Sequence, residues 1–228
     1  MPEGRTDTRR QARAARLAGL YALTPDLPDT AMLVAKVAAA IAGGAVAIQY
    51  RNKRASAALR REQAHALANL CAARGALFIV NDDVDIAHEV DADGVHIGED
   101  DGGIARARAM LGPERLIGVS CYDDWRRAQS AADAGADYVA FGSFFASATK
   151  PDARRADPDL LARAATLPVP VVAIGGITSA NAAVLIEAGA AAVAVIGDVF
   201  AHDEIHAIER AAAAIAALFA KRNSREPS

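Results

Sequence analysis

Eight short apolar runs alternate along the chain with segments of helical periodicity, and few folds accommodate such an alternation. The apolar runs are Leu20–Leu23, Ala45–Ile48, Leu77–Val80, Gly94–Ile97, Leu116–Val119, Tyr138–Phe141, Val171–Ile174 and Ala192–Ile196. A short apolar run closed by turn residues is typical of a strand buried on both faces of a parallel sheet. Eight strands alternating with eight helices predict a closed (β/α)8 barrel, or TIM barrel, with an open doubly wound sheet as the alternative.

Helical periodicity fills the connections between the predicted strands. The predicted helices are Ala31–Ala42, Ser56–Arg74, Val84–Val90, Ile104–Leu111, Asp124–Ala134, Asp159–Ala165, Ser179–Ala188 and His202–Ala220. Gly75 and Gly135 follow two of these segments, at the position where a left-handed glycine commonly ends a helix. Asp123–Asp124 and Thr178–Ser179 stand at helix starts, where small polar side chains can cap free N–H groups.

The composition has no linker-like break, so we predict one domain. A basic, alanine-rich helical arm covers residues 1–18, the barrel covers residues 19–220, and a polar tail covers residues 221–228. A chain of 228 residues fits one α/β barrel and can bury most of the surface that the unfolded chain exposes.

Charge and cysteine content argue against several classes of function. A formal net charge of −3 gives no reason to expect a nucleic-acid or membrane partner. No apolar segment of a signal peptide follows the charged N-terminus, and no apolar span is long enough to cross a bilayer. Cys71 and Cys121 lack metal-ligand spacing and are expected to be reduced thiols, Cys121 as a packing residue. We therefore predict a soluble cytoplasmic protein.

Acidic residues follow two neighbouring strands of the predicted barrel, on the face where such barrels carry their active sites. Asn81–Asp83 comes directly after the third apolar run, and Glu99–Asp101 after the fourth. Parallel neighbours would bring both acidic groups to one end of the sheet. Carboxylate oxygens suit a hard divalent cation such as Mg²⁺, which often shares its site with phosphates. Solvated loop carboxylates are the alternative.

Cationic and amide side chains follow the second run. Gln49, Arg51 and Lys53 point the same way at strand spacing, and the two cations favour an anionic ligand. The alternative is an exposed loop edge. His96 lies within the fourth run and is expected to be a satisfied packing residue inside the barrel.

Three later loops carry features that suit phosphate groups. The loop Gly142–Lys150 brings hydroxyl groups beside a lysine, which makes either a phosphate cradle or a mobile surface loop. Gly175–Thr178 and Ile196–Asp198 follow the seventh and eighth runs, where glycine turns leading into helix N-termini commonly bind phosphate in this architecture. A mere tight turn is the alternative. No covalent nucleophile stands out, so the inventory suggests transfer chemistry in which charge on a leaving diphosphate is stabilised.

The chain resembles the thiamine-phosphate synthase family from about Leu20 to Phe200. The motifs that carry the resemblance are, in chain order, QYRNK at 49–53, FIVNDDVDIA at 78–87, GVHIGEDD at 94–101, GVSCYDD at 118–124, DYVAFGSFFASATK at 137–150, PVVAIGGIT at 170–178 and AVAVIGDVF at 192–200. The resemblance implies a Mg²⁺-dependent reaction that joins hydroxymethylpyrimidine diphosphate to a thiazole phosphate. Diphosphate leaves first, and the thiazole nitrogen captures the resulting pyrimidine methylene cation.

The resemblance also implies a role for individual residues. Asp82 and Asp101 would bind Mg²⁺, whereas Asp83 and Asp100 would lie behind them or in solvent. The pyrimidine diphosphate would be held by a polar set from several strand ends, namely Gln49, Arg51, Lys53, Asn81, Ser120 and Lys150, of which Ser120 and Lys150 are the catalytic pair. The thiazole phosphate would be held by later loops, through Ser147, Thr149, Gly176, Ile196 and Gly197.

Two other readings compete with synthase activity. The related thiazole tautomerases share the fold, and a non-catalytic phosphate-binding barrel would share the glycine turns. Asp82, Asp101 and Lys53 favour the synthase, because the tautomerase pattern lacks the paired acids and the full cationic set. Gly197 departs from the serine usual in the family and loses a side-chain phosphate donor. The expected partners are small-molecule substrates, and the oligomeric state is left open.

Overall fold

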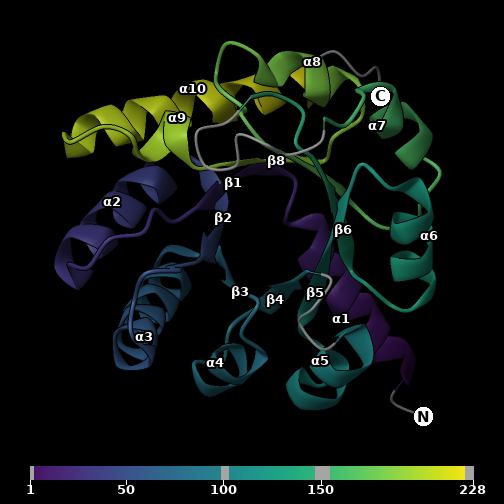
Figure 1. Ribbon diagram of the computed structural model, residues 1–228, viewed down its shortest axis with the longest axis horizontal. Coiled ribbons are helices and arrows are strands. Elements are labelled where there is room, and N and C mark those ends of the chain that lie inside the picture. The colour runs from purple at the N-terminus through teal and green to yellow at the C-terminus, as the bar shows by residue number, and fades with distance from the viewer. Residues whose placement is uncertain (1–2, 99–102, 147–154, 224–228) are drawn as a thin grey trace.

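A closed barrel of eight parallel strands forms the centre of the computed structural model, which describes residues 3–98, 103–146 and 155–223 (Figure 1). The strands, in the same order in the chain and around the barrel, are β1 (Gly19–Leu23), β2 (Ala45–Tyr50), β3 (Leu77–Asn81), β4 (Gly94–Ile97), β5 (Leu116–Tyr122), β6 (Tyr138–Phe141), β7 (Val171–Ile174) and β8 (Ala192–Val195). Pairing of β1 with β8 closes the barrel, with Gly19 opposite Ala192. The predicted barrel is therefore confirmed, and the open sheet is excluded.

Helices surround the barrel, as the alternation in the sequence predicts (Figure 1). They are α1 (Glu3–Ala15), α2 (Thr30–Ala42), α3 (Ala57–Arg74), α4 (Val84–Glu89), α5 (Gly103–Leu111), α6 (Trp125–Asp133), α7 (Asp159–Ala164), α8 (Ala182–Glu187), α9 (Gly197–Phe200) and α10 (Ile205–Asn223). The eight predicted helices all form, within three residues of their predicted ends. The sequence analysis missed the short α9. None of the described helices combines the length and apolar character needed to cross a membrane.

Local sequence signals set several helix ends. Gly75 ends α3 in the left-handed conformation, with φ of 72°. Asp124 caps α6 by accepting hydrogen bonds from the backbone N–H groups of Arg126 and Arg127. The predicted cap at Thr178–Ser179 is wrong, because α8 begins only at Ala182 and lacks a side-chain cap.

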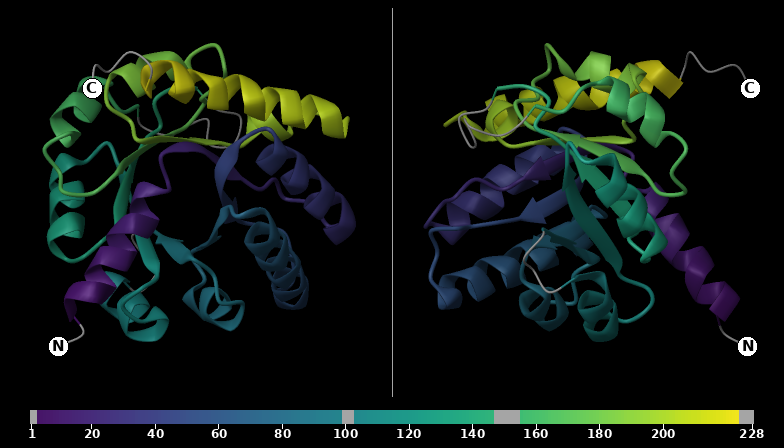
Figure 2. Two further views of the ribbon diagram at one scale, coloured as in Figure 1. Left: turned by 180° about the vertical axis from the view of Figure 1, so that it is seen from behind. Right: turned by 45° about the vertical axis from the view of Figure 1, so that its right-hand side comes forward.

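The N-terminal arm closes the bottom of the barrel, at the amino ends of the strands. Helix α1 crosses the side of the molecule that is turned toward the viewer in the left panel of Figure 2. Ala14 and Leu17 pack into the barrel's interior cluster. Arg10 Nε lies 2.9 Å from Asp137 Oδ1, just before β6. The arm is thus part of the folded core.

We expect Leu17→Ala to lower the free energy of unfolding by about 2–5 kcal/mol, because it leaves a cavity under the barrel. Leu17 is fully buried. Chemical denaturation measures the change, and Met32→Ala on α2 is the control because the Met32 side chain is exposed. Equal stability of the two variants would contradict a structural role for the arm.

Candidate active site

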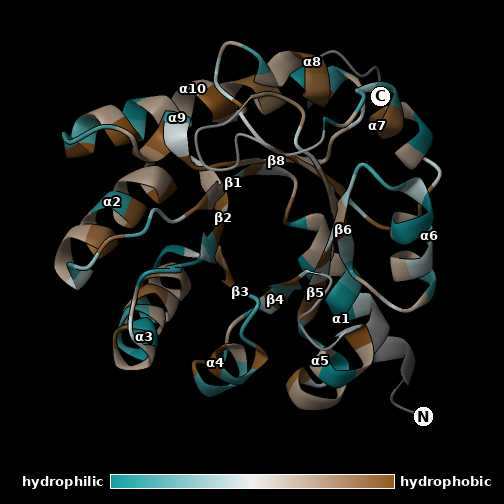
Figure 3. Ribbon diagram, in the orientation of Figure 1, coloured by the Kyte–Doolittle hydropathy of each residue, from teal (hydrophilic) through white to brown (hydrophobic). Residues whose placement is uncertain are grey.

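A cavity of about 510 Å³ opens at the carboxyl ends of β2 and β3. Figure 3 shows the change at the end of β3 from hydrophobic strand to hydrophilic connection. Charged and amide side chains from both strand ends line the cavity, among them Arg51, Asn52, Lys53, Asn81, Asp82 and Asp83. The cations predicted after β2 and the acids predicted after β3 therefore line the same cavity.

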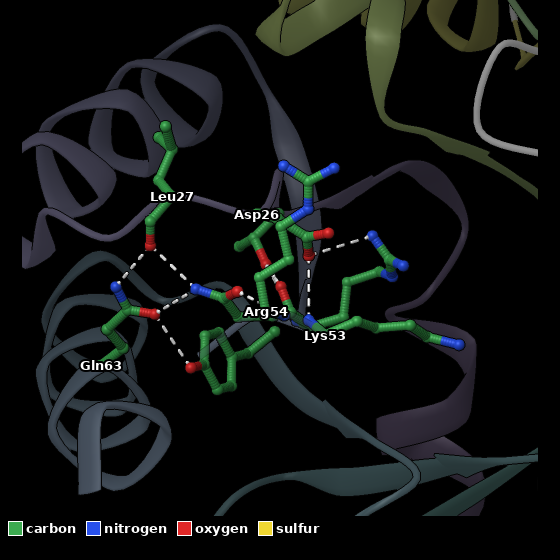
Figure 4. A network of polar contacts seen from close by, with 9 residues as sticks. Asp26, Leu27, Lys53, Arg54 and Gln63 are labelled. Carbon is green, nitrogen blue, oxygen red and sulfur yellow. Dashed lines mark hydrogen bonds and ion pairs between the residues drawn. The ribbon is translucent and has the colours of Figure 1, made fainter. Parts of the chain in front are cut away.

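The segment after β2 is held by Asp26, a residue that the sequence analysis did not single out. Asp26 Oδ1 accepts a hydrogen bond from the backbone N–H of Lys53 at 3.0 Å and lies 3.4 Å from Arg51 Nη1 (Figure 4). Thr24 Oγ1 accepts from the backbone N–H of Arg51 at 2.9 Å and donates to the carbonyl of Arg51 at 2.7 Å. The backbone that carries both cations is consequently fixed on the β1 side.

A buried amide cluster holds the other side of the same segment (Figure 4). Asn52 Nδ2 donates to the carbonyl of Leu27 at 2.8 Å and to Gln63 Oε1 at 3.0 Å. The Tyr50 hydroxyl also donates to Gln63 Oε1, at 2.9 Å. Asn52 is only 5% exposed. It anchors the segment on α3, between the two cations that line the cavity.

Gln49 lies elsewhere, inside the barrel rather than in the lining of this cavity. Its side-chain Nε2 donates to the Tyr21 hydroxyl at 2.8 Å, and the residue is 3% exposed. Strand β2 ends at Tyr50. Gln49 is therefore a strand residue, whereas Arg51 and Lys53 belong to the loop that follows the strand. Arg51 and Lys53 therefore line the cavity, whereas the Gln49 side chain is buried inside the barrel.

The two acids after β3 have different surroundings, since Asp82 is exposed in the cavity and Asp83 caps a helix. Asp82 is exposed in the cavity lining, with a left-handed backbone at φ of 64°, and its N–H donates to the carbonyl of His96 at 2.8 Å. Asp83 Oδ1 instead accepts from the backbone N–H of Ile86 and caps α4. Asp101, the second predicted ligand, lies outside the described residues, as do Glu99 and Asp100.

The oxygen donors at this end of β3 suit Mg²⁺, which prefers carboxylate and amide oxygens and completes its shell with phosphates and water. Asn81 and Asp82 both line the cavity. In residues 3–98, 103–146 and 155–223, no group of three or more His, Cys, Asp and Glu side chains gathers for a metal. Asp83 and Asp85 also line the cavity, but Asp83 caps α4, so the Asp82 carboxylate beside the Asn81 amide fits a metal that also binds a substrate phosphate.

Ser120 lies near the end of β5 and contacts His96 on the neighbouring strand. His96 Nε2 and Ser120 Oγ are 2.9 Å apart, and His96 Nδ1 is 3.2 Å from the Tyr138 hydroxyl. His96 is 7% exposed, as expected of a satisfied packing residue. It also touches a predicted substrate residue, which the sequence analysis did not anticipate.

The glycine turn after β7 allows the loop after β6 to pack against it. Gly175 and Gly176 have φ of 103° and 63°. A Cβ atom at Gly175 would lie 2.0 Å from Ser143 Oγ, and one at Gly176 would lie 2.2 Å from the carbonyl oxygen of Ala146. Close approach of these two loops therefore explains both glycines, and no helix starts directly at this turn.

The turn after β8 differs, because Gly197 is the first residue of α9. It is exposed, and a Cβ atom there would meet no atom of the described residues within 4 Å. Ile196, just before it, is half-buried. The remaining predicted residues of the phosphate loops, Ser147, Thr149 and Lys150, lie outside the described residues.

Both cysteines are buried packing residues, as predicted for Cys121. Burial raises the pKa of the Cys71 and Cys121 thiols to about 12. Each therefore stays a neutral thiol near pH 7, and neither is a candidate nucleophile.

Sequence reasoning missed the cavity residues that come from helices, including two arginines. Arg60 of α3 and Arg106 of α5 both line the cavity. The Arg60 Nε atom is buried and has no hydrogen-bond partner in the described part of the chain. Arg60 lies at the start of α3, four residues after the capping residue Ser56, and its helical spacing alone gives no signal that it lines a cavity.

A family model described as thiamine monophosphate synthase matches residues 20–199. The thiamine-phosphate synthase of Methylobacillus flagellatus is 56% identical over 192 residues, which cover 84% of this chain and 92% of the relative. That of Chromobacterium violaceum is 55% identical over 198 residues, covering 87% and 96%. The solved structure of thiamine phosphate pyrophosphorylase from Pyrococcus furiosus is similar with a TM-score of 0.79 and 33% identity, over 94% of this chain and 98% of that one. The chain belongs to the thiamine monophosphate synthase family.

Proposed function

We propose that this protein is a thiamine-phosphate synthase, which transfers a pyrimidinylmethyl group from diphosphate to a thiazole phosphate. The observation that carries the proposal is the cavity at the ends of β2 and β3, where Arg51 and Lys53 share the lining with Asp82. Cations beside a carboxylate suit a diphosphate that arrives with a divalent metal. The close relatives named thiamine-phosphate synthase support the same reaction.

Loss of diphosphate is the step that the cations assist. Negative charge grows on the leaving diphosphate as the bond from the pyrimidine methylene carbon to oxygen breaks, and preorganised donors stabilise that charge. Arg51 and Lys53 supply the positive charge that stabilises it, from a backbone segment that Asp26 holds in place. Lys150 is proposed to add a third cation. When bound, Mg²⁺ supplies Lewis-acid neutralisation of the phosphate oxygens, with Asp82 and Asp101 as its proposed protein ligands.

The thiazole phosphate is proposed to bind at the loops after β6, β7 and β8. Backbone N–H groups at Gly176 and Gly197, which have no side chains, and at the neighbouring Ile196 are suited to an anion. Ser147 and Thr149 would add hydroxyl donors. The thiazole nitrogen then attacks the pyrimidine methylene cation and forms the new carbon–nitrogen bond.

An assay of the purified protein with both substrates tests the proposal directly. We expect thiamine phosphate and diphosphate to form with Mg²⁺, and product formation to stop when EDTA removes the metal and to resume when Mg²⁺ is returned. Absence of product in the presence of Mg²⁺ would overturn the proposal. Isomerisation of a thiazole phosphate without the pyrimidine substrate would indicate a tautomerase instead.

A further inference from the structure

Five polar side chains form a continuous hydrogen-bonded chain across the interior of the barrel. We call this the interior polar chain, and its members, in order of contact, are Gln49, Tyr21, Tyr138, His96 and Ser120. The four contacts measure 2.8, 3.0, 3.2 and 2.9 Å. The residues come from β2, β1, β6, β4 and β5, and the first four members are each less than 10% exposed. The two ends are Gln49 and Ser120, and both are predicted to bind the pyrimidine diphosphate.

The first members of the interior polar chain set its direction. An amide nitrogen only donates, so Gln49 Nε2 gives a hydrogen to the Tyr21 oxygen. A phenol has one hydrogen, and the other contact of the Tyr21 hydroxyl in the described residues is the hydroxyl of Tyr138. Burial raises the pKa of both phenols, so each keeps its hydrogen. Tyr21 therefore donates to Tyr138.

The two contacts of the His96 ring set its tautomer. Tyr138 has accepted from Tyr21, so its own hydrogen goes to His96 Nδ1. A neutral imidazole that accepts at Nδ1 carries its hydrogen on Nε2. His96 Nε2 then donates to Ser120 Oγ. Within residues 3–98, 103–146 and 155–223, the hydroxyl hydrogen of Ser120 has no acceptor and is available to a ligand.

We propose that the interior polar chain is directional and makes Ser120 a hydrogen-bond donor to a ring nitrogen of the aminopyrimidine, with His96 and Tyr138 as positioning residues. The proposal rests on the proposed function, because the pyrimidine is its substrate. Ring nitrogens of a pyrimidine are acceptors, so a serine locked as a donor matches them. A serine free to rotate would match them only part of the time.

The sequence makes room for this chain on the strand between its two rings. His96, Gly118 and Tyr138 occupy matching positions on β4, β5 and β6. A Cβ atom at Gly118 would lie 2.0 Å from Tyr138 Cζ. Because glycine has no side chain, the rings of His96 and Tyr138 stack across it with centroids 5.6 Å apart. The alignment of the Tyr138 hydroxyl with His96 Nδ1 therefore depends on the glycine at position 118.

Nitrogen NMR of the ligand-free protein tests the direction without any need for activity. Long-range proton–nitrogen correlations at a pH above about 8, where an ordinary imidazole with a pKa of about 6.5 is neutral, distinguish the two tautomers. Loss of one set of signals in His96→Gln assigns the residue. We expect the hydrogen on Nε2, and a hydrogen on Nδ1 would overturn the proposal.

Tyr138→Phe links the direction to substrate binding. The variant keeps the ring stack but removes the donor to Nδ1, so we expect mixed tautomers of His96 and a KM for the pyrimidine diphosphate raised about tenfold, the value of one good hydrogen bond. Tyr122→Phe is the control, since Tyr122 is exposed and outside the interior polar chain. An unchanged tautomer together with an unchanged KM would overturn the proposal. An inactive wild-type protein with hydrogen on Nε2 would instead refute the proposed function alone.

Discussion

Asp82→Asn is expected to lower kcat/KM by about 10²–10³-fold, the usual loss when one charge-stabilising group of an active site is removed. The substitution exchanges the charged side chain of a proposed metal ligand for a weak neutral one. It also preserves the backbone, because Asp82 has a φ of 64° and asparagine tolerates the left-handed region well. Alanine would add backbone strain to the loss of charge, so asparagine isolates the effect of the carboxylate.

Asp91→Asn provides a matched control for that experiment. Asp91 is an exposed aspartate with a left-handed backbone, at φ of 54°, in the connection that precedes β4, and it pairs with Arg115. We expect wild-type activity from it and nearly unchanged melting temperatures for both variants. The Asp82→Asn enzyme should also need more Mg²⁺ for half-maximal activity. Retained activity, or unfolding of Asp82→Asn but not of Asp91→Asn, would contradict a ligand role.

The fold was predictable from the sequence because its determinants are local. Apolar runs and glycine or aspartate at helix ends act within a few residues, so β4, β6 and β7 form at their predicted limits. The acids and cations after the strands were predictable for a related reason. The architecture itself brings successive parallel strand ends together, so Arg51 and Asp82 meet without any pairing signal in the sequence.

Contacts that join distant parts of the chain could not be predicted in this way. The hydroxyls of Tyr21 and Tyr138 meet across 117 residues, and the contact exists only because the barrel closes. Arg60 follows helical periodicity on α3 and looks like a solvent-facing residue until the neighbouring strand end is known. The role of Asp26 likewise depends on where the segment carrying Arg51 lies in space.

Gly118→Ala is expected to lower the free energy of unfolding by about 3 kcal/mol, at the upper end of the usual cost of overpacking a core. The added Cβ would lie 2.0 Å from Tyr138 Cζ and 2.4 Å from its hydroxyl oxygen. Tyr138 is fully buried and meets Tyr21 edge to face on one side and His96 on the other, so its ring has little room to move. Equilibrium denaturation measures the loss.

Gly197→Ala is the matched control for stability, since a Cβ there meets nothing and the backbone is not left-handed. The decisive measurement is a double-mutant cycle with Tyr138→Ala, which removes the ring that the new methyl group strikes. If the clash is the cause, Gly118→Ala costs less in the Tyr138→Ala background, by at least about 1 kcal/mol of coupling. Additive costs would mean that the methyl group and the ring do not meet. They would then place the stack of His96 on Tyr138 somewhere other than across β5, and the directional chain to Ser120 would lose its geometric basis.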